Sequence, residues 1–197
     1  QDLYNYLGIA GGDTSSLISS VMVQKQDSGT GVKVKIITQS NITKITSNQY
    51  ANAAITAGVS DVEIDVASVS KVTGESALTG VYKALEANGE TLDPERTQVA
   101  QDELETTNEI AQNNADDSNF DSARLDQALV EIKQELAQIK QNQGSAATTE
   151  QVEQVVQDAL KKFNLSDIIS QDDIDKLIAF AKKYQNTSAI DLSLIHI

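Results

Sequence analysis

The sequence has no cysteine, no tryptophan, one proline and one histidine, His196, which is the last residue but one. Without cysteine the chain can form no disulfide, no thiolate metal site and no cysteine nucleophile. With one histidine it also lacks the side chain from which most general bases and many transition-metal sites are built. We therefore predict no catalytic residue, no metal site and no cofactor.

Basic residues and long apolar runs are also scarce. The chain carries 29 acidic against 15 basic residues, a net charge of −14, which disfavours nonspecific attraction to nucleic acid or anionic membranes. No stretch approaches the ~20 apolar residues that cross a membrane. We predict neither a nucleic-acid partner nor a membrane span.

Three segments have the composition and the alternating pattern of strands: residues 17–24, 32–36 and 62–66. The first two flank a glycine-containing turn, which predicts an antiparallel hairpin. The alanine-rich residues 50–57 predict a helix between the second and third segments. This order predicts a right-handed strand-helix-strand unit, because parallel neighbours in a sheet are connected in that way.

The polar positions of these segments indicate how they pair. Lys33 and Lys35 alternate on one segment, and Glu63 and Asp65 alternate on another. We expect these charges to lie beside one another on neighbouring strands. The sequence therefore predicts an α+β fold, with a small three-stranded mixed sheet and helices on one of its faces.

The second half of the chain has helical periodicity throughout. A polar break, NNADDSNFD, begins at Asn113, so we divide the chain into an α+β domain, residues 1–112, and a helical hairpin or bundle, residues 113–191. Five residues repeat with the spacing of a heptad seam: Leu125, Leu129, Ile132, Leu136 and Ile139. The seam is short for a coiled coil, so intramolecular packing is favoured over oligomerisation, which stays the alternative.

The last residues, 192–197, read LSLIHI and continue none of the preceding patterns. They match the translation of a sequencing adapter, and we interpret them as a foreign tail. The alternative is a short terminal strand or helix end. Burial of Leu194 and Ile195 in the core would count against the adapter.

Two long blocks carry a family resemblance: YANAAITAGV from Tyr50, and VTGESALTGVYKALE from Val72. With YLGIAGG before them and VAQDEL after them, they resemble the bacterial domain-of-unknown-function 1002 family, also called YpuA-like. The resemblance implies an exported protein of Firmicutes, extracellular or associated with the cell envelope, and here a fragment truncated at both ends. It implies no activity.

The best candidate for a ligand site is the start of the second helix, at Thr73, Gly74, Glu75 and Ser76. It follows a strand, and free backbone N–H groups beside a glycine suit a small anion. The alternative is an ordinary helix cap, which the acid at Glu75 favours because it would repel an anion.

Two weaker motifs are also present. Ser68 and Lys71 match the S-x-x-K of serine β-lactamases, but the partner motifs S-D-N and K-T-G do not occur. Asp117, Asn119 and Asp121 imitate the first ligands of a calcium loop whose later ligands are missing. We interpret both as structural.

The sequence thus favours a non-catalytic, exported interaction module that binds an unidentified protein or envelope partner. The alternative is an extracellular enzyme or small-ligand binder that uses acidic residues or the Thr73–Ser76 turn. An exposed apolar surface would indicate the first, and a pocket with converging carboxylates the second.

Overall fold

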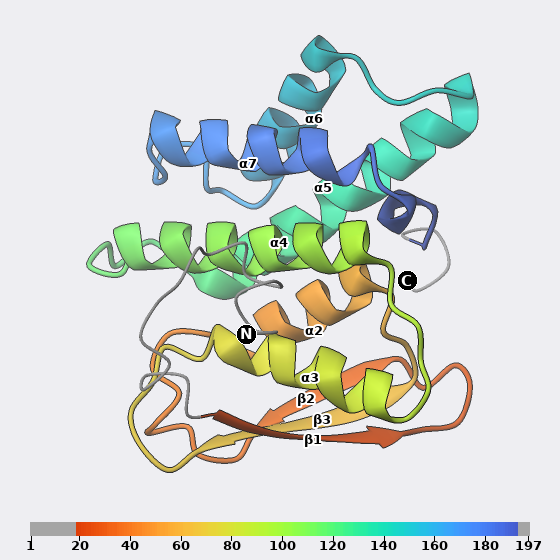
Figure 1. Ribbon diagram of the computed structural model, residues 1–197. Helices are drawn as coiled ribbons and strands as arrows, with labels where there is room; N and C mark the ends of the chain where they lie inside the picture. The colour runs from red at the N-terminus through yellow and green to blue at the C-terminus, as the bar shows by residue number, and fades with distance from the viewer. Residues whose placement is uncertain (1–18, 193–197) are drawn as a thin grey trace, which may run out of the picture. The chain divides into compact units, whose positions relative to one another are not determined.

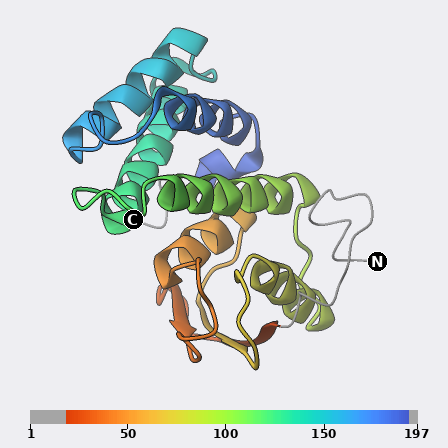
Figure 2. The same ribbon diagram turned by 90° about the vertical axis from the view of Figure 1, so that its left-hand side faces the viewer.

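The computed structural model describes residues 19–192, which divide into two compact units between Leu104 and Glu105. The division falls inside one long helix, α4 (Pro94–Asn113), which runs without a break from the first unit into the second (Figure 2). The boundary expected at residues 112–113 lies at the end of the same helix, and it stays a prediction.

From residue 19 to the start of α4, the first unit has three strands and two helices (Figure 1). In chain order they are β1 (Ser19–Lys25), β2 (Val32–Ile36), α2 (Ser47–Ala57), β3 (Val62–Ser68) and α3 (Ser76–Ala87). α2 packs against β2 and α3 packs against β1, on the same face of the sheet. The predicted α+β class and the three-stranded mixed sheet are confirmed.

The predicted hairpin between the first two strands is wrong. The strand order is β1-β3-β2, so β3 lies between the two strands that are neighbours in sequence. β3 runs antiparallel to β1 and parallel to β2. The parallel pair β2–β3 with α2 between its strands confirms the predicted strand-helix-strand unit.

β3 takes the central position because its apolar side chains fill the middle of the core. Val62, Ile64 and Val66 are fully buried, whereas the corresponding valines of β1 and β2 are only half-buried. The connection from β1 to β2 therefore spans β3. Asp61, just before β3, holds this connection by accepting hydrogen bonds from the Gly29 and Gly31 N–H groups at 2.9 and 3.0 Å.

Helix α2 begins and ends at residues suited to cap a helix. The Thr46 side chain accepts from the Gln49 N–H at 3.1 Å, and the Gln49 side chain accepts from the Thr46 N–H at 2.8 Å, which together form a capping box at the start of α2. Gly58 ends α2 at φ 96°, a left-handed conformation that favours glycine. The Arg96 side chain then donates to the Thr56 carbonyl at 3.1 Å, which satisfies part of the free C-terminal end of α2.

The second unit is helical, as predicted. After α4 it contains α5 (Ser122–Gln143), α6 (Thr149–Lys162), α7 (Gln171–Tyr184) and a 3₁₀ helix, η2 (Ser188–Leu192). α5 packs against α6 and α7, and α6 packs against α7. The Gln185 side chain exchanges two hydrogen bonds with the backbone of Ala147, at 3.0 and 3.1 Å, and so fastens the end of α7 to the loop between α5 and α6.

The heptad seam of α5 is packed within the chain. Leu125, Leu129, Ile132 and Leu136 are buried, and Ile139 is half-buried. This burial agrees with intramolecular packing, while oligomerisation through the seam stays a prediction. Residues 193–197, with Leu194 and Ile195, lie outside the described residues, so the adapter interpretation stays a prediction too.

Candidate functional site

The structure brings the four predicted site residues together at the start of α3. Gly74 is buried at φ +108°, and the Tyr50 hydroxyl donates a hydrogen bond to its carbonyl. A β-carbon at Gly74 would lie 2.5 Å from the Tyr50 hydroxyl oxygen and 2.9 Å from Ile42 Cγ2. Only glycine fits here, since both its conformation and its surroundings exclude a side chain.

The neighbouring side chains bind one another. The Thr73 hydroxyl donates to the Glu75 carboxylate at 3.1 Å, and the Ser76 hydroxyl lies 2.9 Å from the Ser19 hydroxyl. The N-cap residue of α3, Glu75, makes no capping hydrogen bond to the helix through its side chain. Burial raises the pKa of Tyr50, and the nearby Glu75 charge raises it further, so Tyr50 is a neutral donor. Through the hydrogen bond from Tyr50 to Gly74, this turn holds the start of α3 against α2. Whether it binds a ligand stays a prediction.

The Ser68–Lys71 motif lies at the end of β3 in a hydrogen-bonded turn. The buried Ser68 donates its hydroxyl to the Ser70 carbonyl at 2.7 Å, and its N–H donates to the Thr38 hydroxyl at 2.8 Å. Lys71 is exposed. Ser68 thus closes the end of the strand and is not poised as a nucleophile, in agreement with the structural interpretation.

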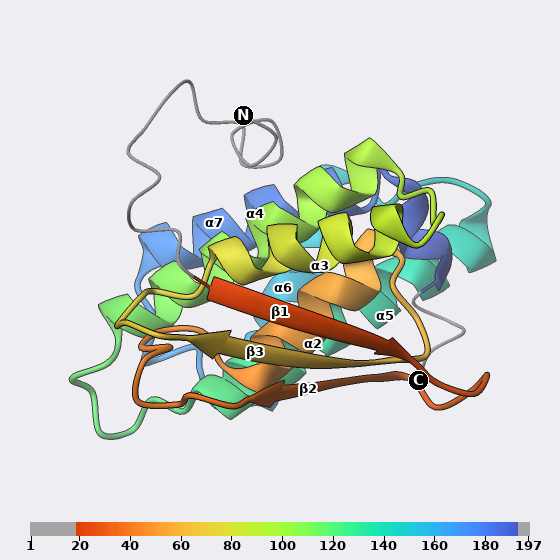
Figure 3. The same cartoon turned by 60° about the horizontal axis from the view of Figure 1, so that its bottom comes forward.

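Among residues 19–104, no further element covers the face of the sheet opposite α2 and α3 (Figure 3). Among the described residues, the exposed large hydrophobic side chains are Met22, Ile37 and Val69, with exposed fractions of 58%, 59% and 88%. Met22 lies on β1, Ile37 directly follows β2, and Val69 directly follows β3. All three fall in the outward phase of their strands, so we call them, with Ala67 between them, the open-face patch.

The same face also carries charges, which begin at Asp65, the β3 partner of Met22. Lys33 lies beside Glu63 and Lys35 beside Asp65, as predicted, and Lys35 forms an ion pair with Glu63. Hydrogen bonding to Glu63, together with the Glu63 and Asp65 charges, raises the pKa of Lys35. The pair is exposed and contributes little to stability. It marks a polar border beside the open-face patch.

A pocket of about 210 Å³ lies where β1 and α3 end and β3 begins. Two acids line it, Asp61 and Glu90. Asp61 binds the Gly29 and Gly31 N–H groups, and Glu90 forms an ion pair with Lys25. The carboxylates are already bound within the chain, and they do not form the converging pair that an acid–base enzyme would need.

The acidic motif at Asp117 lies in the turn before α5. The Asp117 carboxylate accepts from the Asn119 N–H at 2.8 Å, and the Asp121 carboxylate accepts from the Ala123 N–H at 2.9 Å as the N-cap of α5. Within residues 19–192, no group of three or more histidine, aspartate or glutamate side chains could hold a metal ion. This geometry supports the interpretation of the motif as a helix-entry loop.

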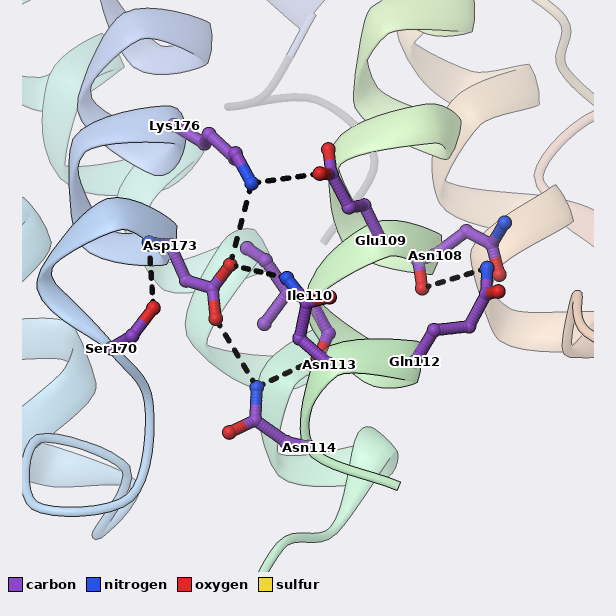
Figure 4. A network of polar contacts seen from close by, with 9 residues as sticks. All are labelled: Asn108, Glu109, Ile110, Gln112, Asn113, Asn114, Ser170, Asp173 and Lys176. Carbon is purple, nitrogen blue, oxygen red and sulfur yellow. Dashed lines mark hydrogen bonds and ion pairs between the residues drawn. The ribbon is translucent and has the colours of Figure 1, made fainter. Parts of the chain in front are cut away.

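The second unit contains a buried carboxylate, Asp173 (Figure 4). Its two oxygens accept from the side-chain amides of Asn113 at 2.9 Å and Asn114 at 3.3 Å, at the end of α4. Its N–H donates to Ser170, the N-cap of α7, at 3.2 Å. Lys176 links α7 to the same stretch by an ion pair with Glu109 at 2.8 Å. The network joins two helix ends and leaves neither Asp173 oxygen available for chemistry.

Comparison with known proteins identifies the family. A sequence model of the family described as "Protein of unknown function (DUF1002)" matches residues 1–196. The chain belongs to the DUF1002 family. It is also 32% identical over 169 residues to the uncharacterised protein YpuA of Bacillus subtilis (strain 168). No solved structure matches it.

The match to YpuA covers 85% of this chain and 52% of YpuA. The chain thus spans about half the length of this relative. The resemblance to the DUF1002 family is confirmed. Because the family is described as being of unknown function, membership assigns no activity to this chain. None of the helices within residues 19–192 is long and apolar enough to cross a membrane.

The open-face patch is the feature of this DUF1002 chain that the sequence did not predict. The sequence does contain an indication of the patch: an apolar residue at a strand position where the alternation calls for a polar one. Met22 occurs in the phase of Ser20 and Gln24, and Ile37 occurs in the phase of the two β2 lysines. Recognising the patch needs the strand order, because only the order places these positions on one surface.

Proposed function

We propose that this chain is a non-catalytic interaction module of an exported, extracellular or envelope-associated protein. It binds a protein partner through the open-face patch. The observation that carries the proposal is that Met22, Ile37 and Val69, exposed apolar side chains on three strand segments, fall on one sheet face that no described element of the first unit covers. Apolar surface of this kind marks interaction sites, since water solvates it poorly.

The partner we propose has an apolar contact surface with an acidic group at its border. The acidic group would meet Lys33, which makes no ion pair among residues 19–192, while Lys35 is already bound to Glu63. Within the described residues, buried acids such as Asp173 are bound by other side chains, and the pocket acids Asp61 and Glu90 are bound as well. The exposed apolar side chains and Lys33 are therefore explained better by binding of a partner than by catalysis.

The test compares two variants of the full-length parent protein. I37K/V69K places two charges in the patch, and A115K/Q138K adds the same charge at exposed positions of the second unit. We expect envelope extracts to yield a partner that binds the wild type and A115K/Q138K but not I37K/V69K. A photo-crosslinker at position 37 should join the same partner. Retention by I37K/V69K would contradict the proposal.

Further measurements test apolar binding, the small-ligand alternative and export separately. With the purified partner, binding should have a negative heat-capacity change because apolar surface is buried. A small molecule that raises the melting temperature, with no protein partner found, would favour the enzyme or small-ligand alternative. Recovery of the parent protein only from the cytosolic fraction of its host would contradict export without contradicting the binding surface.

A further inference from the structure

In the part of the chain that the structure describes, β1 forms one edge of the sheet and β2 forms the other (Figure 3). The Gln26 N–H donates to the Asp61 carbonyl at 2.7 Å, in line with the β1–β3 register. Because backbone groups alternate in direction along an antiparallel strand, the amide groups of the odd-numbered residues of β1 point away from β3. Those residues are Ser19, Val21, Val23 and Lys25. This edge can accept another strand.

β1 lacks the features that usually prevent such pairing. It is seven residues long, contains no proline, and has one charged residue, Lys25, at its end. Lys25 is already paired with Glu90. β2, by contrast, has lysines at positions 33 and 35, and charged side chains of this kind protect edge strands.

The flank above this edge is apolar and incompletely covered. Val21 and Val23 point toward the helices but are only half-buried. On α3, which runs along β1, three of the half-buried residues are small and recur every fourth position: Ser76, Gly80 and Ala84. Gly80 faces Val21, and Ser76 bonds to Ser19, so this side of α3 lies over β1.

We propose that β1 pairs with β1 of a second copy of this chain, antiparallel and centred on Met22. In this register Val21 lies opposite Val23 of the second copy, and their outward amide groups exchange hydrogen bonds. Ser20 lies opposite Gln24 of the second copy, and Met22 lies opposite Met22 of the second copy on the open face. No two like charges face each other along the paired strands.

The charge pattern selects this edge over the other. If β2 paired with itself about Val34, Lys33 would lie opposite Lys35 of the second copy twice, and like charges opposite each other are destabilising. β1 carries one charge, and the same two-fold pairing places Lys25 opposite Ser19. In a chain with a net charge of −14, β1 is therefore a segment on which two copies can meet without repulsion between their contacting side chains.

The dimer joins two three-stranded sheets into one sheet of six strands. Its two-fold axis is perpendicular to the sheet, so α3 of each copy lies on the same side and the open faces merge on the other. Ile37 and Val69 lie away from the paired edge and stay accessible. The dimer shares Met22 with the open-face patch, but it is inferred from the β1 edge, and self-association is measured on the chain without a partner, so either proposal can fail while the other holds.

The test measures self-association of the whole chain by sedimentation velocity over a range of concentrations. Met22→Lys places two lysines opposite each other on the axis, and it is tolerated in the monomer because Met22 is exposed. We expect the wild type to dimerise and M22K to weaken the dimer at least about tenfold. The matched control is I37K, equally exposed but away from β1, which should dimerise like the wild type. Mixing M22K with M22E should restore the dimer.

A cross-linking experiment tests the register directly. The chain has no cysteine, so M22C introduces a single thiol per copy. Residues opposite each other in a non-hydrogen-bonded pair have Cα atoms ~4.5 Å apart, which suits a disulfide. Under mild oxidation M22C should give a covalent dimer much faster than I37C. A wild type that stays monomeric up to about 1 mM, equal weakening by M22K and I37K, or equal cross-linking by M22C and I37C would each overturn the proposal.

Discussion

Gly80 of α3 lies so close to Val21 of β1 that a β-carbon at Gly80 would overlap Val21 Cγ2. One turn earlier, the Ser76 and Ser19 hydroxyls are in contact at 2.9 Å. The absence of a side chain at Gly80 thus sets the distance between helix and strand. The fully buried Ala53, Ala54 and Ala57 serve the same purpose on α2.

We predict that Gly80→Ala destabilises the first unit by about 1–3 kcal/mol, because the added methyl group overpacks the contact. Helix propensity alone would give the opposite sign, a gain of about 1 kcal/mol from alanine. Urea unfolding distinguishes the two, with exposed Lys83→Ala on the same helix as the control. In a double-mutant cycle, Val21→Ala should recover part of the loss. A more stable G80A would show that the helix can shift freely.

Tyr50 provides a prediction for alkaline pH. Tyr50→Phe leaves the buried Gly74 carbonyl without its donor and should cost about 1–3 kcal/mol near neutral pH. Since burial raises the pKa of Tyr50 above its ordinary value of 10.0, the unfolded chain ionises first. The stabilisation is therefore complete below pH 10 and is lost as pH rises toward the folded-state value.

Chemical unfolding at a series of pH values tests this sign. The free energy of unfolding of the wild type should fall more steeply above pH 10 than that of Y50F, since the variant lacks this ionisation. The contributions of the other tyrosines cancel in the comparison. Parallel curves for the two proteins would show that Tyr50 ionises equally in both states.

The sequence predicts the elements of the first unit because local patterns record them. Alternation gives each strand and its apolar face, and Thr46 with Gln49 marks the start of α2. The strand order is not local, and the short turn after β1 favours a hairpin on its own. The difference is decided by Ile64 and its neighbours on β3, which are buried only when β3 lies between the other strands.

The same distinction applies to the candidate sites. The Thr73–Ser76 turn lies in one stretch of chain, so the sequence predicts its position and its helix start. The bond from Tyr50 to Gly74 depends on how α2 meets α3, which no local pattern contains. The open-face patch needs still more, because Met22 and Val69 come together only through the order of the strands.

Calcium should leave the protein unchanged. The Asp117 and Asp121 carboxylates accept backbone hydrogen bonds in the turn before α5, and later calcium ligands are missing from the sequence. We therefore expect the melting temperature in millimolar calcium to equal the melting temperature in sodium chloride at the same ionic strength. A saturable increase that Asp117→Ala abolishes would identify a calcium site at this turn.

Asp173 should be the polar residue on which the stability of the second unit depends most directly. Asp173→Asn keeps the shape of the side chain but replaces one acceptor oxygen by an NH₂ group that faces the Asn113 or Asn114 amide. Two donors then meet in a buried position, and we expect a loss of about 1–3 kcal/mol. Asp172→Asn is the matched control: it neutralises an exposed acid in the same first turn of α7, so both variants lose a similar interaction with the helix dipole.

Urea unfolding of the two variants, followed by hydrogen exchange at the ends of α4 and α7, separates the side-chain contacts of Asp173, which include an ion pair with Lys176 at 3.7 Å, from the helix-dipole effect. D173N should unfold at lower urea and exchange faster around Asn114 and Ser170, whereas D172N should change the midpoint only slightly. Equal losses in both variants would assign the effect to the helix dipole. Faster exchange confined to α7 would mean that the amides of Asn113 and Asn114 find other acceptors, and that Asp173 does not hold the two helix ends together.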